Sequence, residues 1–421
     1  MRRMLHRLRL PRAGAWLACA FWRLVLALAT LLQPGVLPAQ RPVTLDELVA
    51  RAMRDNLDAR SARLRLDAAR ADWRAARGVP NPVFSVSPQS PYQYILAAPL
   101  DVGPQRTYRV RAGRDGADAA TSDVRDAERL VRFAVRAGYF DLLLADSLRE
   151  VARGEREFFR ALLASDSARV RSGDAPERNL AKSELELAKA DAGLSQAEAS
   201  VRAASMALQI AAGISHPDTG FRVEGAAATR PLPRFDDRAV DSLLALRPDV
   251  QAARQRVTLG EDARALAAAQ LVPVPQLSLV HQPDGPFPNG QHLALGVGVQ
   301  VPLWNWLGGE RARADAARDA ARLDLERVEA QARADIAVAL DQYRATSRLA
   351  ARFDAGLLAT SRRALETAQY AYAAGALSYV DLLDAIRTYG EVRADAAQAQ
   401  HDAWVSAFAV ARALGRDEDF R

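Results

Sequence analysis

The absence of proline from the C-terminal part of the chain is the strongest constraint on its fold. No proline follows Pro302, and alanine, arginine, glutamate, aspartate and leucine, most of which favour helix, dominate the rest. We therefore predict one helix from Glu310 to Ala374, which would be roughly 100 Å long. An interruption at Gly375 and a second helix from about Ser378 to Leu414 follow. Helices of this length are typical of coiled coils or helical tubes.

The first half of the chain follows the same plan. A predicted helix from Thr44 to Arg77 opens with a capping-box pattern and ends at Gly78. A long proline-free stretch then runs from Gln105 to Ala175. A turn at Gly173–Pro176 leads into a further predicted helix, from about Glu177 to Ala212. Each half thus contains a long helical hairpin.

Four short segments between the helices alternate apolar and small or polar residues, as β-strands do. The clearest runs from Leu293 to Val301, with leucine and valine at every second position. Its predicted partner is about Pro275 to Val280, and the first-half equivalents are about Val83 to Ser87 and Tyr92 to Leu100. Each half therefore contributes one predicted hairpin.

The two halves can be superimposed as an internal duplication. The matching segments are Asn56–Arg60 with Arg247–Gln251, Pro82–Val86 with Pro275–Leu279, Pro99–Asp101 with Pro302–Trp304, and Gly173 with Gly375. The predicted boundaries are a signal peptide at 1–39, a first repeat at 40–212, a linker at 213–236, a second repeat at 237–415 and a tail at 416–421.

The N-terminal segment has the layout of a secretory signal. Six arginines and no acidic residue precede an apolar run at Leu24–Leu32 and a candidate cleavage site at Leu37–Ala39. A membrane anchor, or a lipoprotein modified at Cys19, is the alternative. The leader accounts for the formal net charge of +6, so the mature chain is close to neutral and its charge does not indicate nucleic-acid binding. Cys19 is the only cysteine, which excludes disulfides from the mature chain.

The residues that usually carry chemistry do not cluster in this sequence. The histidines are scattered, none of them three or four residues from another, and there is no glycine-rich phosphate loop. We therefore predict a protein that is not an enzyme and has no metal site or cofactor. The five histidines are His6, His216, His281, His292 and His401.

Four strands cannot close a membrane barrel, and open strand edges are not tolerated in hydrocarbon. Strands that enter a membrane must therefore be pooled from several chains, and three chains would supply twelve. Trp304 and Trp306 follow the last predicted strand, where they suit an aromatic girdle at a membrane interface. Ordinary packing at the junction is the alternative for both.

The order of these elements, together with the Gly375–Ala385 segment (GALSYVDLLDA), resembles the outer-membrane efflux protein (TolC) family. The resemblance covers about Thr44 to Gly415. It implies a mainly α fold with a small membrane β part, in which two tandem repeats of long helical hairpins form an α-barrel tube. It also implies four strands per chain in a trimeric twelve-stranded β-barrel.

The family resemblance implies a passive duct in the outer membrane, with its helical part in the periplasm. The implied partners are two further copies of the chain, a periplasmic adaptor (membrane fusion) protein and an inner-membrane pump. The helix turns would dock the adaptor, although they can equally be read as simple helix C-caps. The residues concerned are Gly173, Asp174 and Ala175 in one turn and Gly375, Ala376, Leu377 and Ser378 in the other.

The resemblance also implies a gate at the periplasmic end. Its two carboxylates match Asp381 and Asp384, which share a helix face at i,i+3. Two solvated aspartates near a helix N-terminus are the alternative. A tyrosine that closes the gate matches Tyr372, whereas the position of the family's gate arginine is occupied by Leu377. This difference suggests that other contacts close the gate in this chain.

Two other functions fit the same sequence features. The first is a duct for type I protein secretion, which has the same architecture. The second is a periplasmic coiled-coil scaffold or adaptor without a pore, which would not need the alternation at Leu293–Val301. The transported substrate, whether metal ions, drugs, solvents or protein, is left open by the sequence.

Overall fold

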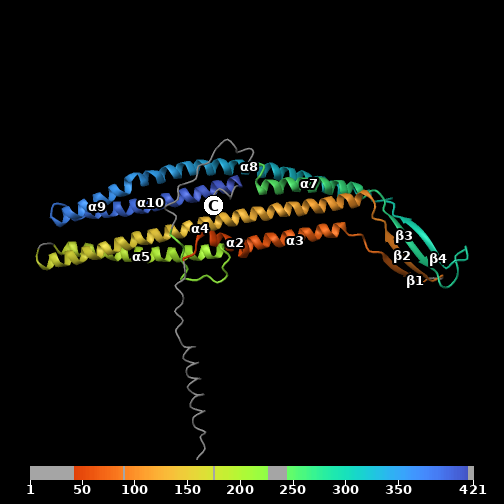
Figure 1. The fold of residues 1–421 in the computed structure, drawn as a ribbon, viewed down its shortest axis with the longest axis horizontal. Coiled ribbons are helices and arrows are strands. Elements are labelled where there is room, and N and C mark those ends of the chain that lie inside the picture. Colours follow the sequence, from red (N-terminus) through yellow and green to blue (C-terminus); the bar gives the residue numbers. More distant parts are fainter. Residues whose placement is uncertain (1–41, 89–90, 174–175, 226–243, 416–421) are drawn as a thin grey trace, which may run out of the picture. The chain divides into compact units, whose positions relative to one another are not determined.

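The computed structural model describes residues 42–88, 91–173, 176–225 and 244–415 of the chain. The predicted leader and tail, and part of the predicted linker, therefore lie outside the described residues. The described chain is mainly helical and has one small sheet (Figure 1). Its elements are α2 (Leu45–Asp55), α3 (Leu57–Arg77), β1 (Val83–Ser87), β2 (Gln93–Pro99), α4 (Pro104–Arg171), α5 (Glu177–Ala211), α7 (Pro248–Ala269), β3 (Pro275–His281), β4 (Leu293–Val299), α8 (Gly308–Arg352), η3 (Phe353–Leu357), α9 (Leu358–Ala373) and α10 (Tyr379–Leu414).

The first predicted helix is divided in two, which corrects the expectation of one helix from Thr44 to Arg77. The capping box is present, since Thr44 Oγ1 accepts a hydrogen bond from the amide of Glu47 and Glu47 Oε2 accepts one from the amide of Thr44. The break lies at Asn56, which has an extended ψ of 134°. Its Oδ1 accepts from the amides of Asp58 and Ala59 and so caps α3.

The long helices are confirmed, with one correction. α4 has 68 residues, which corresponds to about 100 Å. The helix predicted from Glu310 to Ala374 is instead interrupted by η3, a wide turn of five residues between α8 and α9. Gly356 within η3 has a φ of +124°, outside the helical region. No proline was needed for this break, because glycine can adopt the required dihedral angle.

Equivalent positions of the two halves make equivalent contacts. Asn56 Nδ2 donates to the carbonyl of Ala211 at the end of α5. Arg247, the matching residue at the start of α7, donates from Nη1 to the carbonyl of Ala413 near the end of α10. Arg247 is 2% exposed, so this contact is buried. In both halves, the residue that precedes a helix (α3 or α7) is thus hydrogen-bonded to the end of a later helix (α5 or α10).

The two predicted hairpins are joined into one antiparallel sheet in the order β1-β2-β3-β4. Pairing between β2 and β3 makes the join, with Leu96 opposite Leu279. β1 pairs with β2 and β4 pairs with β3, so these two strands form the sheet edges. Figure 1 shows the sheet beyond the ends of α3 and α7, at the opposite end of α4 from its turn into α5.

The apolar cluster that positions the helix turns lies among α4, α5 and α10. It contains the buried side chains of Phe159 and Leu162 on α4, Ala190 on α5, and Leu382 and Ile386 on α10. α9 adds only partly buried side chains to this cluster and has no buried residue of its own. α9 is therefore held less firmly than the three helices around it.

Candidate functional site

One face of the sheet is apolar across all four strands. The register places Phe84, Leu96, Leu279 and Leu295 in one row across the sheet. The same face continues along β4, where Leu295 is 76% and Val297 is 72% exposed. We call this surface the apolar face, and its large apolar members are Phe84, Val86, Tyr94, Leu96, Leu277, Leu279, Leu293, Leu295, Val297 and Val299. Ala98 and His281 share the face, with His281 at one end of β3. So much exposed apolar surface marks an interaction site.

The opposite face of the sheet carries mostly small or polar side chains. One of its rows runs from Ala97 on β2 through Ser278 on β3 to Gly296 on β4. Another joins Gln276 to Gly298. We call this surface the small-residue face. The alternation predicted from the sequence therefore extends in register across strands from both halves of the chain.

Aromatic residues lie near both ends of the apolar face. Trp304 and Trp306 follow β4 and are 91% and 67% exposed, so they are not packed inside this chain. Near the other end, Tyr94 lies opposite His281, and its ring centroid is 5.2 Å from that of Tyr92. The two tyrosines were not singled out from the sequence, because only the register shows that they share an end of the sheet.

The turn between α9 and α10 has the hydrogen bonds of a Schellman motif. Gly375 has a φ of +74°, its amide donates to Tyr372 O, and the amide of Ala376 donates to Ala371 O. Ser378 then caps α10 through its side chain. Leu377 packs against the apolar cluster, so it does not replace an arginine as a polar contact.

The turn between α4 and α5 is described only in part. Gly173 has a φ of +81°, and its amide donates to Val170 O. Asp174 and Ala175, two of the predicted docking residues, lie outside the described residues. A groove of about 710 Å³ lies beside the second turn, between α4 and α9, with Arg169, Tyr372, Gly375 and Leu382 in its walls.

A chain of hydrogen bonds joins four helices close to these turns. Tyr372 on α9 donates from its hydroxyl to Asp166 Oδ1 on α4, at 3.1 Å. Ser183 on α5 donates to Asp166 Oδ2 at 2.5 Å, and its hydroxyl lies 3.0 Å from the hydroxyl of Tyr379 on α10. Asp166 and Ser183 are fully buried. We call these four residues the tip network.

The tip network gives Tyr372, the predicted gate tyrosine, a hydrogen-bond partner on another helix. Burial, together with the neighbouring charge of Asp166, raises the pKa of Tyr372 to about 12, so its hydroxyl stays protonated and can donate. The guanidinium of Arg169 lies over the Tyr372 ring, 5.5 Å from its centroid. The sequence did not predict the other three members of the network, because they come from three separate helices and share no local motif. These residues are Asp166, Ser183 and Tyr379.

The two predicted gate carboxylates are both exposed in the single chain but differ in their contacts. Asp381 occupies the first turn of α10, where its Oδ2 accepts a 2.7 Å hydrogen bond from the Ser378 hydroxyl. Its amide donates back to Ser378 Oγ at 3.2 Å. Within the described part of the chain, Asp384 has no hydrogen-bond or ion-pair partner. Its carboxylate is therefore the freer of the two to face a pore or a neighbouring chain.

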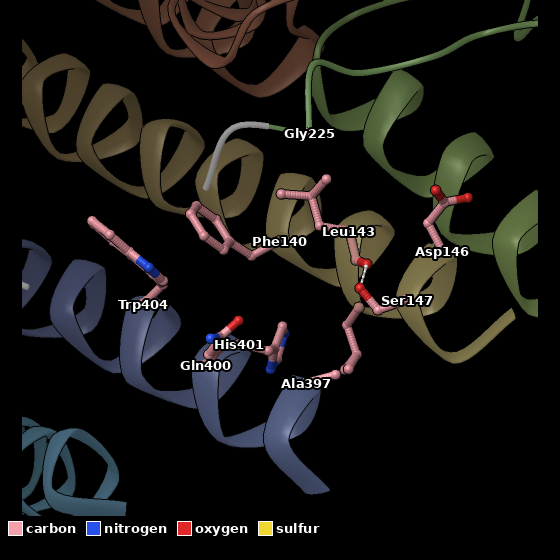
Figure 2. Close-up of a pocket in the computed structure, with 10 residues that line it drawn as sticks. Phe140, Leu143, Asp146, Ser147, Gly225, Ala397, Gln400, His401 and Trp404 are labelled. Carbon is pink, nitrogen blue, oxygen red and sulfur yellow. Dashed lines mark hydrogen bonds between the residues drawn. The ribbon is translucent and has the colours of Figure 1, made fainter. Parts of the chain in front are cut away.

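A cavity of about 230 Å³ lies farther along the helices, between α4 and α10. Figure 2 shows Phe140 and Leu143 of α4 on one side and His401 and Trp404 of α10 on the other. His401 places Nε2 2.7 Å from Asp141 Oδ1 on α4 and Nδ1 2.9 Å from Asp402 Oδ1. The imidazole thus links α10 to α4.

His401 should make the stability of the protein depend on pH. Burial favours the neutral ring, but the hydrogen bonds and charges of Asp141 and Asp402 outweigh it and raise the pKa of His401 above 6.5. A raised pKa contributes stability that is complete below the unfolded value and is lost as pH rises through the folded value. We expect the thermal midpoint to fall between pH 6 and pH 9, and His401→Gln to reduce that fall.

His216→Gln is the matched control for this prediction, because it removes an exposed imidazole from another part of the chain. This variant should keep the pH dependence of the unmodified protein. An equal pH dependence in His401→Gln and in the unmodified protein would show that the link does not contribute.

No set of three histidine, cysteine, aspartate or glutamate side chains in the described residues is arranged to hold a metal ion. None of the helices in the described ranges is both long enough and apolar enough to cross a bilayer.

Comparisons with known proteins agree with this geometry. Residues 239–416 match the family described as outer membrane efflux protein. The cobalt-zinc-cadmium resistance protein CzcC of Cupriavidus metallidurans is 22% identical over 394 residues, which cover 90% of this chain and 91% of CzcC. The similarity to CzcC therefore extends over most of the length of both chains.

Solved structures share the fold. CusC superimposes with a TM-score of 0.76 at 18% identity, covering 88% of this chain and 92% of CusC. The CmeC outer membrane channel of Campylobacter jejuni gives a TM-score of 0.75 at 16% identity, covering 88% of this chain and 85% of CmeC. The family match over residues 239–416, the similarity to CzcC along most of the chain and the fold shared with these channels confirm the resemblance to the outer membrane efflux protein family that was noted in the sequence.

Proposed function

We propose that the protein is a homotrimeric, passive duct that serves as the outer-membrane channel subunit of a tripartite efflux system. The observation that carries this proposal is the two-sided sheet. Its apolar face suits contact with lipid, and its small-residue face suits a water-filled lumen. β4 keeps this alternation over all seven of its residues, a length of about 23 Å along the strand.

The free edges of the sheet support the trimer. Within the described chain β1 and β4 each pair on one side only, and such edges cannot face hydrocarbon. Pairing β4 of one chain with β1 of the next closes the sheet, and three chains give twelve strands. Trp304 and Trp306 then lie at one membrane interface, and Tyr92 and Tyr94 lie at the other.

The helical part is then a tube in the periplasm. In this proposal the turns at Gly173 and Gly375 face away from the membrane and dock a periplasmic adaptor, with the groove beside Tyr372 as part of that surface. An inner-membrane pump supplies the energy, and the channel itself catalyses no reaction. The exposed apolar face argues against the scaffold alternative, because a pore-free scaffold has no need for it.

Conductance in planar bilayers tests both the duct and its gate. Three copies of Asp384 near the threefold axis would attract cations, so the pore of the unmodified trimer should be blocked by a divalent cation. We use Co²⁺ as the probe, since CzcC is named for cobalt resistance. Asp384→Asn should weaken the block by about tenfold in concentration, an order-of-magnitude expectation for removing a charge ring.

Asp381→Asn is the matched control, because Asp381 is already engaged with Ser378 at the start of α10. It should change the block less than Asp384→Asn does. Equal block in the unmodified protein and both variants would remove these residues from the gate, and the absence of any pore would refute the duct.

A further inference from the structure

The wide turn η3 divides the long helix of the second repeat at Gly356. The backbone conformation at this position is one that only glycine adopts readily. Gly356 has φ +124° and ψ 4°. This region of φ/ψ space is strongly unfavourable for residues other than glycine, because their Cβ atom collides with the neighbouring backbone. Single wide turns inside α-helices occur frequently at functional sites. The turn therefore invites a functional explanation.

The break is not a requirement of the repeat. Gly154 and Gly356 stand the same number of residues before Gly173 and Gly375, the glycines of the two turns. Gly154 nevertheless lies inside α4, which is continuous from Pro104 to Arg171. The non-helical dihedral angle is thus specific to the second repeat.

The helix that follows the break is weakly anchored. None of the sixteen residues of α9 is buried. In the described ranges, the Tyr372–Asp166 hydrogen bond is the only one that ties an α9 side chain to another element. α10, by contrast, is joined to α5 by Arg387 and Glu186 and to α4 by His401 and Asp141. α9 therefore lies between the non-helical turn at Gly356 at one end and the tip network at the other.

We propose that Gly356 is the hinge about which α9 moves when the tip network opens, an inference that rests on the proposed gated duct. The positive φ belongs to the conformation in which Tyr372 reaches Asp166. A helical φ at Gly356 would redirect the axis of α9 relative to α8 and withdraw the Tyr372 hydroxyl. The hinge and the hydrogen bond thus define two ends of one moving segment.

Gly356→Ala tests the hinge, because the proposal predicts the direction in which this substitution changes channel opening. Alanine penalises the positive φ, and its Cβ would meet no atom within 4 Å, so the change acts on backbone freedom alone. The fraction of channels in which Tyr372 is hydrogen-bonded to Asp166 should fall, and the ratio of open to closed channels should rise about tenfold. Gly154→Ala is the matched control, because its backbone is already helical and its Cβ meets only Arg393 Nη1, at 3.5 Å.

Two readouts should change together. One is the open fraction of single channels in planar bilayers. The other is the distance between spin labels at Ser165→Cys and Gln369→Cys, which stand in the walls of the groove between α4 and α9. The only native cysteine, Cys19, lies in the predicted leader. In Gly356→Ala the distance distribution should shift to longer values, and in Gly154→Ala it should not.

The outcomes separate the hinge from the duct. An unchanged open fraction and label distance in Gly356→Ala trimers would overturn the hinge while leaving the duct in place. A trimer of the unmodified chain that forms no pore would instead overturn the proposed function. If Gly356→Ala does not assemble, Gly356→Asn carries the same test with a smaller expected shift, because asparagine enters the positive-φ region more readily than alanine.

Discussion

Val297→Lys should prevent the protein from assembling in the outer membrane. Val297 lies on the apolar face in the inner part of β4, is 72% exposed and pairs with Leu277 of β3. A lysine at the midplane of a membrane barrel costs about 2–4 kcal/mol, and a trimer carries three copies. The measurement is the amount of detergent-resistant trimer recovered from outer-membrane fractions, which we expect to fall by at least about tenfold.

Gln276→Lys provides the control on the other side of the same sheet. Gln276 pairs with Gly298 on the small-residue face, which the proposed duct turns toward water. The lysine there should leave trimer recovery nearly unchanged. Equal losses from both substitutions would show that the two faces do not meet different environments, and the proposed orientation of the strands would be wrong.

Tyr372→Phe should open the channel. The substitution keeps the ring beneath Arg169 but removes the hydroxyl that donates to the buried carboxyl group of Asp166. Hydrogen bonds to charged groups contribute about 1.5–3 kcal/mol, so the ratio of open to closed channels should rise at least about tenfold. Single-channel recording on purified trimers measures this ratio directly.

Tyr370→Phe is the control for the hydroxyl itself. Tyr370 lies on the same helix two residues earlier and is 80% exposed. Its substitution should leave gating unchanged. If Tyr372→Phe conducts like the unmodified trimer, the tip network does not hold the channel closed, and the gate must depend on contacts elsewhere.

Local patterns in the sequence were sufficient to predict most elements. The absence of proline and the helix-forming composition predicted α4 and α10, and period-2 alternation predicted all four strands to within one or two residues at each end. These signals act over a few residues and do not require knowledge of the tertiary fold. The faces of the sheet are different, because they become continuous only when the register joins β2 of one half to β3 of the other.

The features that the sequence did not reveal depend on distant partners. The break at Asn56 is stabilised by the carbonyl of Ala211, which lies far away in sequence. The tip network brings Asp166 and Ser183 to Tyr372 only after α4, α5 and α9 have packed together. The family resemblance located the tyrosine and the carboxylates Asp381 and Asp384, but the partner of the tyrosine could be found only in the structure.

The number of chains in the assembled protein tests the central claim most directly, because a four-stranded sheet with two free edges can form a barrel only by pooling strands. The measurement is the native mass of the full-length protein extracted from outer membranes in mild detergent and corrected for bound detergent. We predict the mass of three chains. A monomer with its sheet intact would contradict the account, since its free strand edges would then need no partner.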